Sequence, residues 1–121
     1  MTPEKIKELT LEIAKILDTK KARDVKILKV TEKTVLAGYF VIAAGTSSTQ
    51  VKSLADEVEY ELSTKLGIKP ANVEGRGLGN WILIDYDNII VHVFNPQTRE
   101  FYNLEKLWAE AEEVDFEQVD D

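Results

Sequence analysis

The stretch from Trp81 to Phe94 constrains the fold more than any other, because two apolar runs of strand length flank Asp87-Asn88. Asp and Asn tolerate positive φ better than most residues, so this dipeptide is typical of a tight β-hairpin turn. We expect a two-residue loop at Asp87-Asn88. That loop sets these cross-strand pairs: Tyr86 with Ile89, Ile84 with Val91, Leu83 with His92, and Trp81 with Phe94.

Side chains alternate across a strand, so the predicted hairpin has two distinct faces. One face is apolar apart from one phenol and belongs in the core: Ile82, Ile84, Tyr86, Ile89, Val91 and Val93. The other mixes aromatic, aliphatic and polar residues with the single imidazole of the chain: Trp81, Leu83, Asp85, Ile90, His92 and Phe94. Burying Asp85 and His92 is costly without polar partners. The mixed face therefore suits contact with another molecule.

Composition indicates a globular chain of one domain. Its 121 residues are 44% hydrophobic and 31% charged, and no apolar run approaches the ~20 residues of a membrane span. Polar residues follow Met1, so neither a secretory signal nor a transit peptide is predicted, and we expect a cytoplasmic protein. The absence of cysteine excludes disulfides and Cys-based zinc sites.

Acidic residues are concentrated near the C-terminus. Seven of the 22 acids lie in residues 109–121, which contain no base, so the other 15 acids balance the 15 bases. We therefore expect a neutral domain over residues 1–108 and an acidic tail over residues 109–121 that frays or docks weakly. A neutral body does not favour binding of DNA, or wrapping of RNA, through bulk charge.

Basic residues crowd the segment from Lys20 to Lys33. Lysines on an edge strand deter pairing with other sheets, and this interpretation is favoured. A local patch that touches RNA phosphates is the alternative, and its binding would depend steeply on salt.

Helical and strand periodicities alternate along the chain. Helices are predicted from Thr2-Pro3 to residues 18–20, from Gly45 to Gly67 and over Phe101–Trp108, and strands at residues 23–30, at 39–44, near Val73 and in the hairpin. Residues 95–98 are predicted as a turn. This order favours a single α/β domain, in which helices cover a mixed sheet of four or five strands with residues 39–44 at its centre.

Two glycine-containing segments invite a phosphate-binding interpretation. Gly45-Thr46-Ser47 opens a helix, where backbone N–H groups favour anions, but it lacks the lysine and glycine spacing of a P-loop. Helix capping is therefore favoured there. Gly75–Gly79 precedes a strand instead of following one, so it does not fit a dinucleotide fingerprint. We expect a flexible loop with Arg76 exposed, and partner contact by Arg76 is the alternative.

Catalysis and metal binding find little support in the residue pattern. His92 and Asp85 share the mixed hairpin face, but no Ser or Cys lies near enough to suggest a nucleophile, so no catalytic residue is predicted. One histidine and isolated aspartates do not form a metal site. The aromatic residues around the hairpin and last helix suit a core or a protein interface equally. They are Trp81, Phe94, Tyr102 and Trp108.

Five segments, in this order, resemble the ribosomal silencing factor family, also called the Iojap or RsfS family. They are Tyr39–Ser48, Val51–Glu59, Trp81–Tyr86, Ile90–Phe94 and Phe101–Trp108. The resemblance extends over about residues 4–108. It implies a mixed-sheet fold related to the nucleotidyltransferase fold, without enzymatic activity or a cofactor.

The resemblance also implies a partner. Family members bind protein fourteen of the large ribosomal subunit, block its joining with the small subunit and lower translation when nutrients are scarce. A homodimer is a further expectation, and contact with ribosomal RNA is expected to be minor. The residues that match the contact segment are Trp81, Leu83, Asp85 and His92, followed by Tyr102, Leu107 and Trp108.

The chain departs from the family pattern at three places. Gly38 stands where the family usually has Asp, which weakens any role for a carboxylate there. The hairpin turn is Asp87-Asn88, whereas Gly-Asp is common in the family. The acidic tail after Trp108 is an addition to the family pattern. Nucleotidyltransferases carry paired metal-binding aspartates after their Gly-Ser turn. No such pair follows Gly45-Thr46, so a nucleotide-using enzyme is the less favoured rival.

Overall fold

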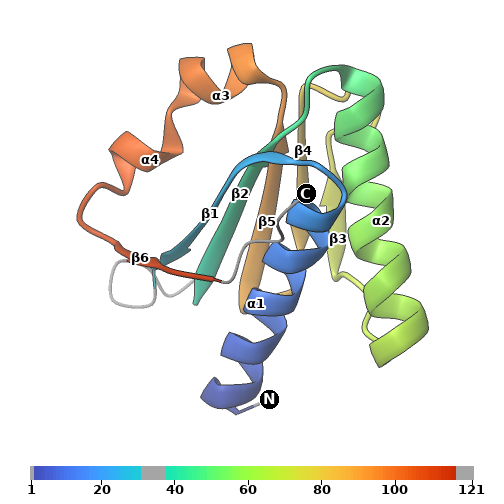
Figure 1. Ribbon diagram of the computed structural model, residues 1–121, viewed down its shortest axis with the longest axis vertical. Coiled ribbons are helices and arrows are strands. Elements are labelled where there is room, and N and C mark those ends of the chain that lie inside the picture. Colours follow the sequence, from blue (N-terminus) through green and yellow to red (C-terminus); the bar gives the residue numbers. More distant parts are fainter. Residues whose placement is uncertain (1, 31–37, 117–121) are drawn as a thin grey trace.

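A mixed six-stranded sheet forms the centre of the protein, and its strands lie in the order β3-β4-β5-β2-β1-β6 (Figure 1). The computed structural model describes residues 2–30 and 38–116. Its elements are α1 (Pro3–Thr19), β1 (Arg23–Lys29), β2 (Tyr39–Ala44), α2 (Ser48–Leu66), β3 (Asn72–Glu74), β4 (Trp81–Asp85), β5 (Ile89–Phe94), α3 (Pro96–Tyr102), α4 (Leu104–Leu107) and β6 (Glu112–Val114). The predicted α/β class is confirmed. The short strand predicted near Val73 is β3, and the sheet has six strands, not four or five, because β6 joins its other edge.

Local signals set the ends of the two long helices. Thr2 Oγ1 accepts a hydrogen bond from the Lys5 N–H at 3.2 Å, and Pro3 begins α1 without losing an intrahelical bond. Ser47 Oγ caps α2 by accepting from the Gln50 N–H, and Gly67 ends that helix at a φ of 66°. Both predicted helices are confirmed.

Strand β2 occupies the middle of the sheet. All six of its residues are buried, as the apolar run from 39 to 44 predicts. It pairs in parallel with β5 and antiparallel with β1, so the sheet is mixed. Since α2, β3 and β4 lie between β2 and β5 in the chain, the connection between the two parallel strands also brings in a covering helix.

The hairpin of β4 and β5 has the predicted register. Trp81 lies opposite Phe94, Leu83 opposite His92, and Ile84 opposite Val91. Asp87 adopts a φ of 68°, the conformation that the turn chemistry favours. The register therefore separates the two hairpin faces as the alternating pattern predicts.

Each side of the sheet has its own core. On the first face, α1 and α2 cover an almost wholly aliphatic cluster that includes Ile82, Ile84, Val91 and Val93. On the second face lies a smaller buried cluster, against which residues of α4 and the segment after it pack. This second-face cluster consists of Leu28, Val30, Phe40, Ile42 and Phe94.

The C-terminal third differs most from the prediction. Residues 95–98 are not a turn: the Asn95 side chain accepts from the Thr98 N–H at 2.8 Å and caps α3. The predicted single helix over Phe101–Trp108 is wrong, because Asn103 adopts a left-handed conformation and divides it into α3 and α4. Residues 112–114 do not fray. They form β6, which pairs antiparallel with β1.

Candidate functional site

A row of aromatic rings crosses the second face of the sheet. It runs from α4 over β2, β5 and β4 to α3, with neighbouring ring centroids between 4.8 and 5.9 Å apart. In order, the row consists of Trp108, Phe40, His92, Trp81, Tyr102 and Phe101. Aromatic pairs at such distances gain stability beyond their buried area, so each ring of the row helps to hold its neighbour.

His92 is the most buried polar member of this row. Its side chain is only 5% exposed, and its Nδ1 accepts a hydrogen bond from the Trp81 Nε1–H at 3.1 Å. Burial lowers the pKa of His92 to about 4, so the ring is neutral near pH 7. A neutral imidazole that accepts at Nδ1 carries its proton on Nε2. The buried ring of His92 is thus fixed against the Trp81 indole.

Trp81 is held from several directions. Its indole stacks on Phe94 with centroids 4.9 Å apart and contacts Tyr102 at 4.8 Å. A hollow of about 460 Å³ lies beside it, lined by Leu78, Thr98 and Tyr102 among others. The indole therefore forms one wall of an open recess at the end of the aromatic row.

The glycine-rich loop before β4 contacts α2 through Arg76, whose side chain is exposed as predicted. Arg76 pairs with Asp56 at 2.6 Å and also with Glu59, both on α2. Gly75 has a φ of 89°, and a Cβ there would lie 1.9 Å from the Trp81 carbonyl oxygen, so no other residue fits. These contacts hold Leu78 out into solvent beside Trp81.

The helices α3 and α4 present large apolar side chains to solvent. Phe101 is 80% exposed, Tyr102 is 51% exposed and Leu107 is 73% exposed. Leu78, in the loop before β4, is 78% exposed. We call these four residues, together with half-buried Trp81, the aromatic surface. Arg99 stabilises its base, because its buried guanidinium pairs with Glu105 at 3.2 Å and donates to the Arg23 carbonyl.

Asp85 lies away from His92. It sits opposite Ile90 in the register, and its Oδ1 accepts from the Asp87 N–H at 2.7 Å across the hairpin turn. The structure therefore does not bring the two together as a base and its orienting carboxylate. Leu83 and Asp85 are both half-buried on the second face. Trp108 joins the row only through Phe40, at 5.2 Å.

The predicted capping role of residues 45–48 is confirmed. While Ser47 accepts from the Gln50 N–H, the Gln50 side-chain oxygen accepts from the Thr46 N–H in return. This arrangement is a variant of the capping box, in which the return bond is made to the residue before the cap. It satisfies the Thr46 and Gln50 N–H groups, which an anion would otherwise bind. Within residues 2–30 and 38–116, no three His, Asp or Glu side chains are grouped so that they could hold a metal ion.

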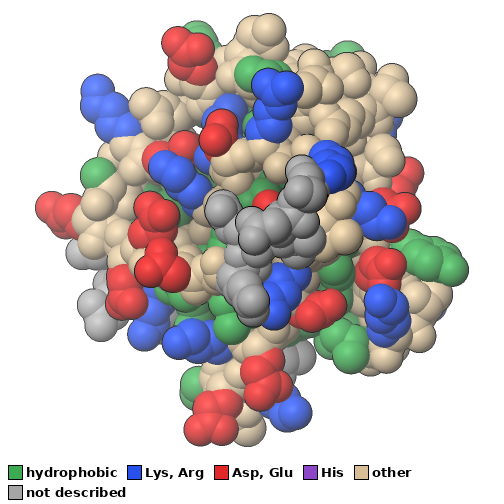
Figure 2. Space-filling view, viewed as in Figure 1, with side chains coloured by type: hydrophobic (Ala, Val, Ile, Leu, Met, Phe, Trp, Pro, Cys, Tyr) green, Lys and Arg blue, Asp and Glu red, His purple; other side chains and the backbone are tan. Residues whose placement is uncertain are grey.

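Surface charge is mixed in sign. On the side shown in Figure 2, acidic and basic side chains are intermingled. Lys20 pairs with Glu57 at 3.6 Å, and Lys29 lies opposite Glu112 of β6, so parts of the basic segment already face acids. Lys33 falls outside the described residues.

Of the helices in the described part of the chain, none is both long and apolar enough to cross a membrane.

Sequence reasoning missed two members of the aromatic surface. Phe101 was considered only as the first residue of a predicted helix, and Leu78 only as part of a loop defined by its glycines and arginine. The available signal was Asn95-Pro96, which is typical of a cap followed by the first helical residue. Starting the helix there, and ending it at Asn103, turns Phe101 outward.

The fold and this surface define a class: a small α/β domain that presents exposed aromatic side chains on one face of its sheet. The chain belongs to the ribosomal silencing factor family. The family model described as "Ribosomal silencing factor during starvation" matches residues 3–121. The predicted family is thus confirmed, and the match includes the acidic segment that sequence reasoning treated as extra.

Curated relatives agree with this assignment. Ribosomal silencing factor RsfS of Halalkalibacterium halodurans is 38% identical over 103 residues, which cover 85% of this chain and 87% of the relative. RsfS of Bacillus subtilis is 36% identical over 100 residues, covering 83% of this chain and 84% of the relative. A crystal structure of a protein from Chromobacterium violaceum has a TM-score of 0.79 and 31% identity, and the match covers 98% of this chain and 95% of that one.

Proposed function

We propose that this protein represses translation by binding the large ribosomal subunit through its protein fourteen, which sterically blocks joining with the small subunit. The observation that carries the proposal is the aromatic surface, in a chain that belongs to the ribosomal silencing factor family. No reaction is part of the proposed function, and the protein needs no cofactor for it.

The chemistry of the aromatic surface suits a protein partner. Leu78, Trp81 and Tyr102 line one recess, and exposed aromatic and leucine side chains of this kind are typical anchors of protein interfaces. Leu83 and Asp85 extend this surface along β4, where the carboxylate of Asp85 would meet a basic group of the partner. Trp108 would extend it along α4, next to Leu107.

His92 takes a different role from the one that the resemblance implies. Because its ring lies under Trp81, it supports binding by fixing the orientation of the indole. Preorganised side chains lose less entropy on binding, so this hydrogen bond would favour the bound arrangement.

Sedimentation with purified ribosomal subunits tests the proposal. The protein is expected to pellet with large subunits and not with small ones, and to reduce the fraction of joined ribosomes. Tyr102→Ala is expected to weaken binding to large subunits by at least about tenfold, the range of an interface anchor. Tyr60→Ala is a matched control, because Tyr60 is 64% exposed on α2 and distant in the fold from α3.

Two results contradict the proposal. One is a protein that pellets with neither subunit. The other is a folded Tyr102→Ala variant that binds large subunits as tightly as the Tyr60→Ala control, since this would place the contact elsewhere.

A nucleotide-using enzyme is the rival, and the capping box at residues 46–50 already weakens it. Calorimetric titration with nucleoside triphosphate and magnesium separates the two. Heat of binding at millimolar nucleotide would favour the rival, and its absence would remove it. RNA binding by the basic segment Lys20–Lys33 would instead appear as a steep loss of affinity with salt.

The proposed homodimer would use the same aromatic surface as the ribosome. The expected homodimer would draw on the exposed side chains of α3 and α4, so it would compete with the ribosome. Sedimentation equilibrium of Phe101→Ala against the parent chain tests this: a shared surface predicts that the variant loses both dimer and ribosome binding together.

A further inference from the structure

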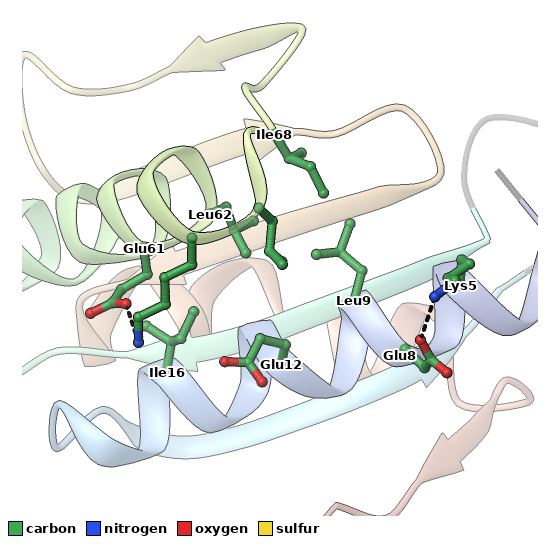
Figure 3. A pocket seen from close by; sticks show the side chains of 10 residues that line it. Lys5, Glu8, Leu9, Glu12, Ile16, Glu61, Leu62 and Ile68 are labelled. Atoms are coloured by element: carbon green, nitrogen blue, oxygen red, sulfur yellow. Dashed lines mark ion pairs between the residues drawn. The ribbon is translucent and has the colours of Figure 1, made fainter.

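A groove lies between α1 and α2, on the outer side of the first face (Figure 3). Its volume is about 530 Å³. Leu9 and Ile16 of α1 line one wall, Leu62 and Leu66 of α2 the other, and Ile68 closes one end. Leu66 is 53% exposed, so the groove leaves apolar area open to solvent.

The charges along this groove are unevenly matched. Lys5 pairs with Glu8 at 3.6 Å, and Lys65 pairs with Glu61 at 2.7 Å (Figure 3). Glu12 lies one turn beyond Glu8 on α1, and its exposed side chain lines the same groove. The Glu61 carboxylate, with a smaller contribution from that of Glu12, raises the pKa of Lys65. Three carboxylates and two ammonium groups line the groove, so acidic groups are in excess there.

We propose that this groove binds an amphipathic helix of a partner protein, one that carries a basic residue at the centre of its apolar stripe. The apolar stripe would cover Leu66 and Ile68, and the central cation would pair with Glu12. Helix-in-groove binding of this kind anchors side chains at spacings of three, four and seven residues.

The dimensions fit such an occupant. From Lys5 to Ile16 the groove follows α1 for about 16 Å, because each helical residue rises ~1.5 Å. That length accommodates about three turns of a third helix. Its packing against α1 and α2 would resemble the packing of those helices on each other.

The groove and the aromatic surface lie on opposite sides of the sheet. Helices α1 and α2 cover the first face, whereas the aromatic row crosses the second. An occupant of the groove therefore leaves the aromatic surface open, and the protein could hold two partners at once. The inference does not rest on the proposed ribosomal function.

Two synthetic peptides of about 15 residues provide the probe, since three to four turns span the groove. Both carry leucines at helical stripe spacing, one with a central Lys and one with a central Glu. Titration into the isotope-labelled full chain is followed through the backbone amide signals of Leu9, Ile16 and Leu62. The Lys peptide is expected to shift these signals and to bind about fivefold more tightly than the Glu peptide, the range of a partly exposed ion pair.

Variants identify the source of this preference. Glu12→Gln is expected to abolish the difference between the peptides, while Glu4→Gln, on the same helix but outside the groove, leaves it unchanged. Glu12 is exposed, so both variants should fold. Neither should change sedimentation with large subunits, which separates this test from that of the proposed function.

Three results overturn the inference. The first is the absence of groove shifts with either peptide. The second is a preference for the Lys peptide that survives Glu12→Gln. The third is hexylamine binding in the groove as tightly as the Lys peptide, because the occupant would then be a free apolar amine and not a helix.

Discussion

The two faces of the sheet belong to the same strands but differ in their side chains and in the helices that cover them. The first face carries aliphatic side chains, closed over by two helices of 17 and 19 residues. The second carries aromatic rings, partly covered by helices of 7 and 4 residues that leave Phe101 and Leu107 outside. The first face therefore contributes most of the buried area that stabilises the fold. The second face offers the surface that is available for contact.

This division follows from what the side chains offer. Aliphatic residues gain stability only by burial, so long helices must cover them. Aromatic rings retain apolar area and defined geometry when half exposed, which suits an interface. Substitutions on the two faces should thus separate stability from binding.

The largest expected effect is on the first face. Ile84 is fully buried between Val73 and Val91 in the sheet, and Ile84→Ala removes methyl groups that the surroundings cannot replace. The free energy of unfolding should fall by about 2–5 kcal/mol. Urea denaturation followed by tryptophan fluorescence measures it. A loss below about 1 kcal/mol would contradict the assignment of stability to this face.

The next effect concerns acid stability and depends on His92. Its pKa is about 4 in the fold and 6.5 when unfolded, so the unfolded chain takes up a proton first as pH falls. Stability should be full above pH 6.5 and should drop by roughly 2 kcal/mol by pH 5. Urea denaturation across this interval tests it.

His92→Gln is the control for this pH dependence, because glutamine does not titrate and His92 is the only histidine in the chain. In this variant the free energy of unfolding should no longer fall between pH 6.5 and 5 because of residue 92. If the slope persists in His92→Gln, another group is responsible, and the burial of His92 under Trp81 does not govern acid stability.

The smallest effect on stability is expected on the second face. Leu107 is largely exposed on α4, so Leu107→Ala should change the free energy of unfolding by less than about 0.5 kcal/mol. Binding to large subunits should nevertheless weaken. Equal losses of stability in Leu107→Ala and Ile84→Ala would remove the distinction between the faces.

The hairpin and the first face could be predicted because their signals are local. The pair Asp87-Asn88 fixes the turn, and the turn with the alternating pattern fixes which residues point inward. The C-terminal region could not be predicted in the same way. Asn103 in the left-handed conformation divides a segment whose spacing suits one helix, and β6 depends on pairing with a strand far away in the sequence.

The candidate site shows the same limit. Trp81 and Tyr102 could be identified from residue type and from the resemblance, and the structure brings them into contact. The burial of His92 could not be predicted from the sequence, because it depends on the rings of Phe40 and Trp81, which lie on other strands. Sequence patterns assign a side chain to a face but not the depth at which it lies.

The position of β6 has a consequence for the order of folding. It pairs with β1, whose residues precede it by more than eighty positions. Chains are made from the N-terminus, and pairings between distant segments form late. The outer edge of β1 therefore stays unpaired during synthesis until residues 112–114 have emerged. β1 is the first strand to be made and the last to gain its second neighbour.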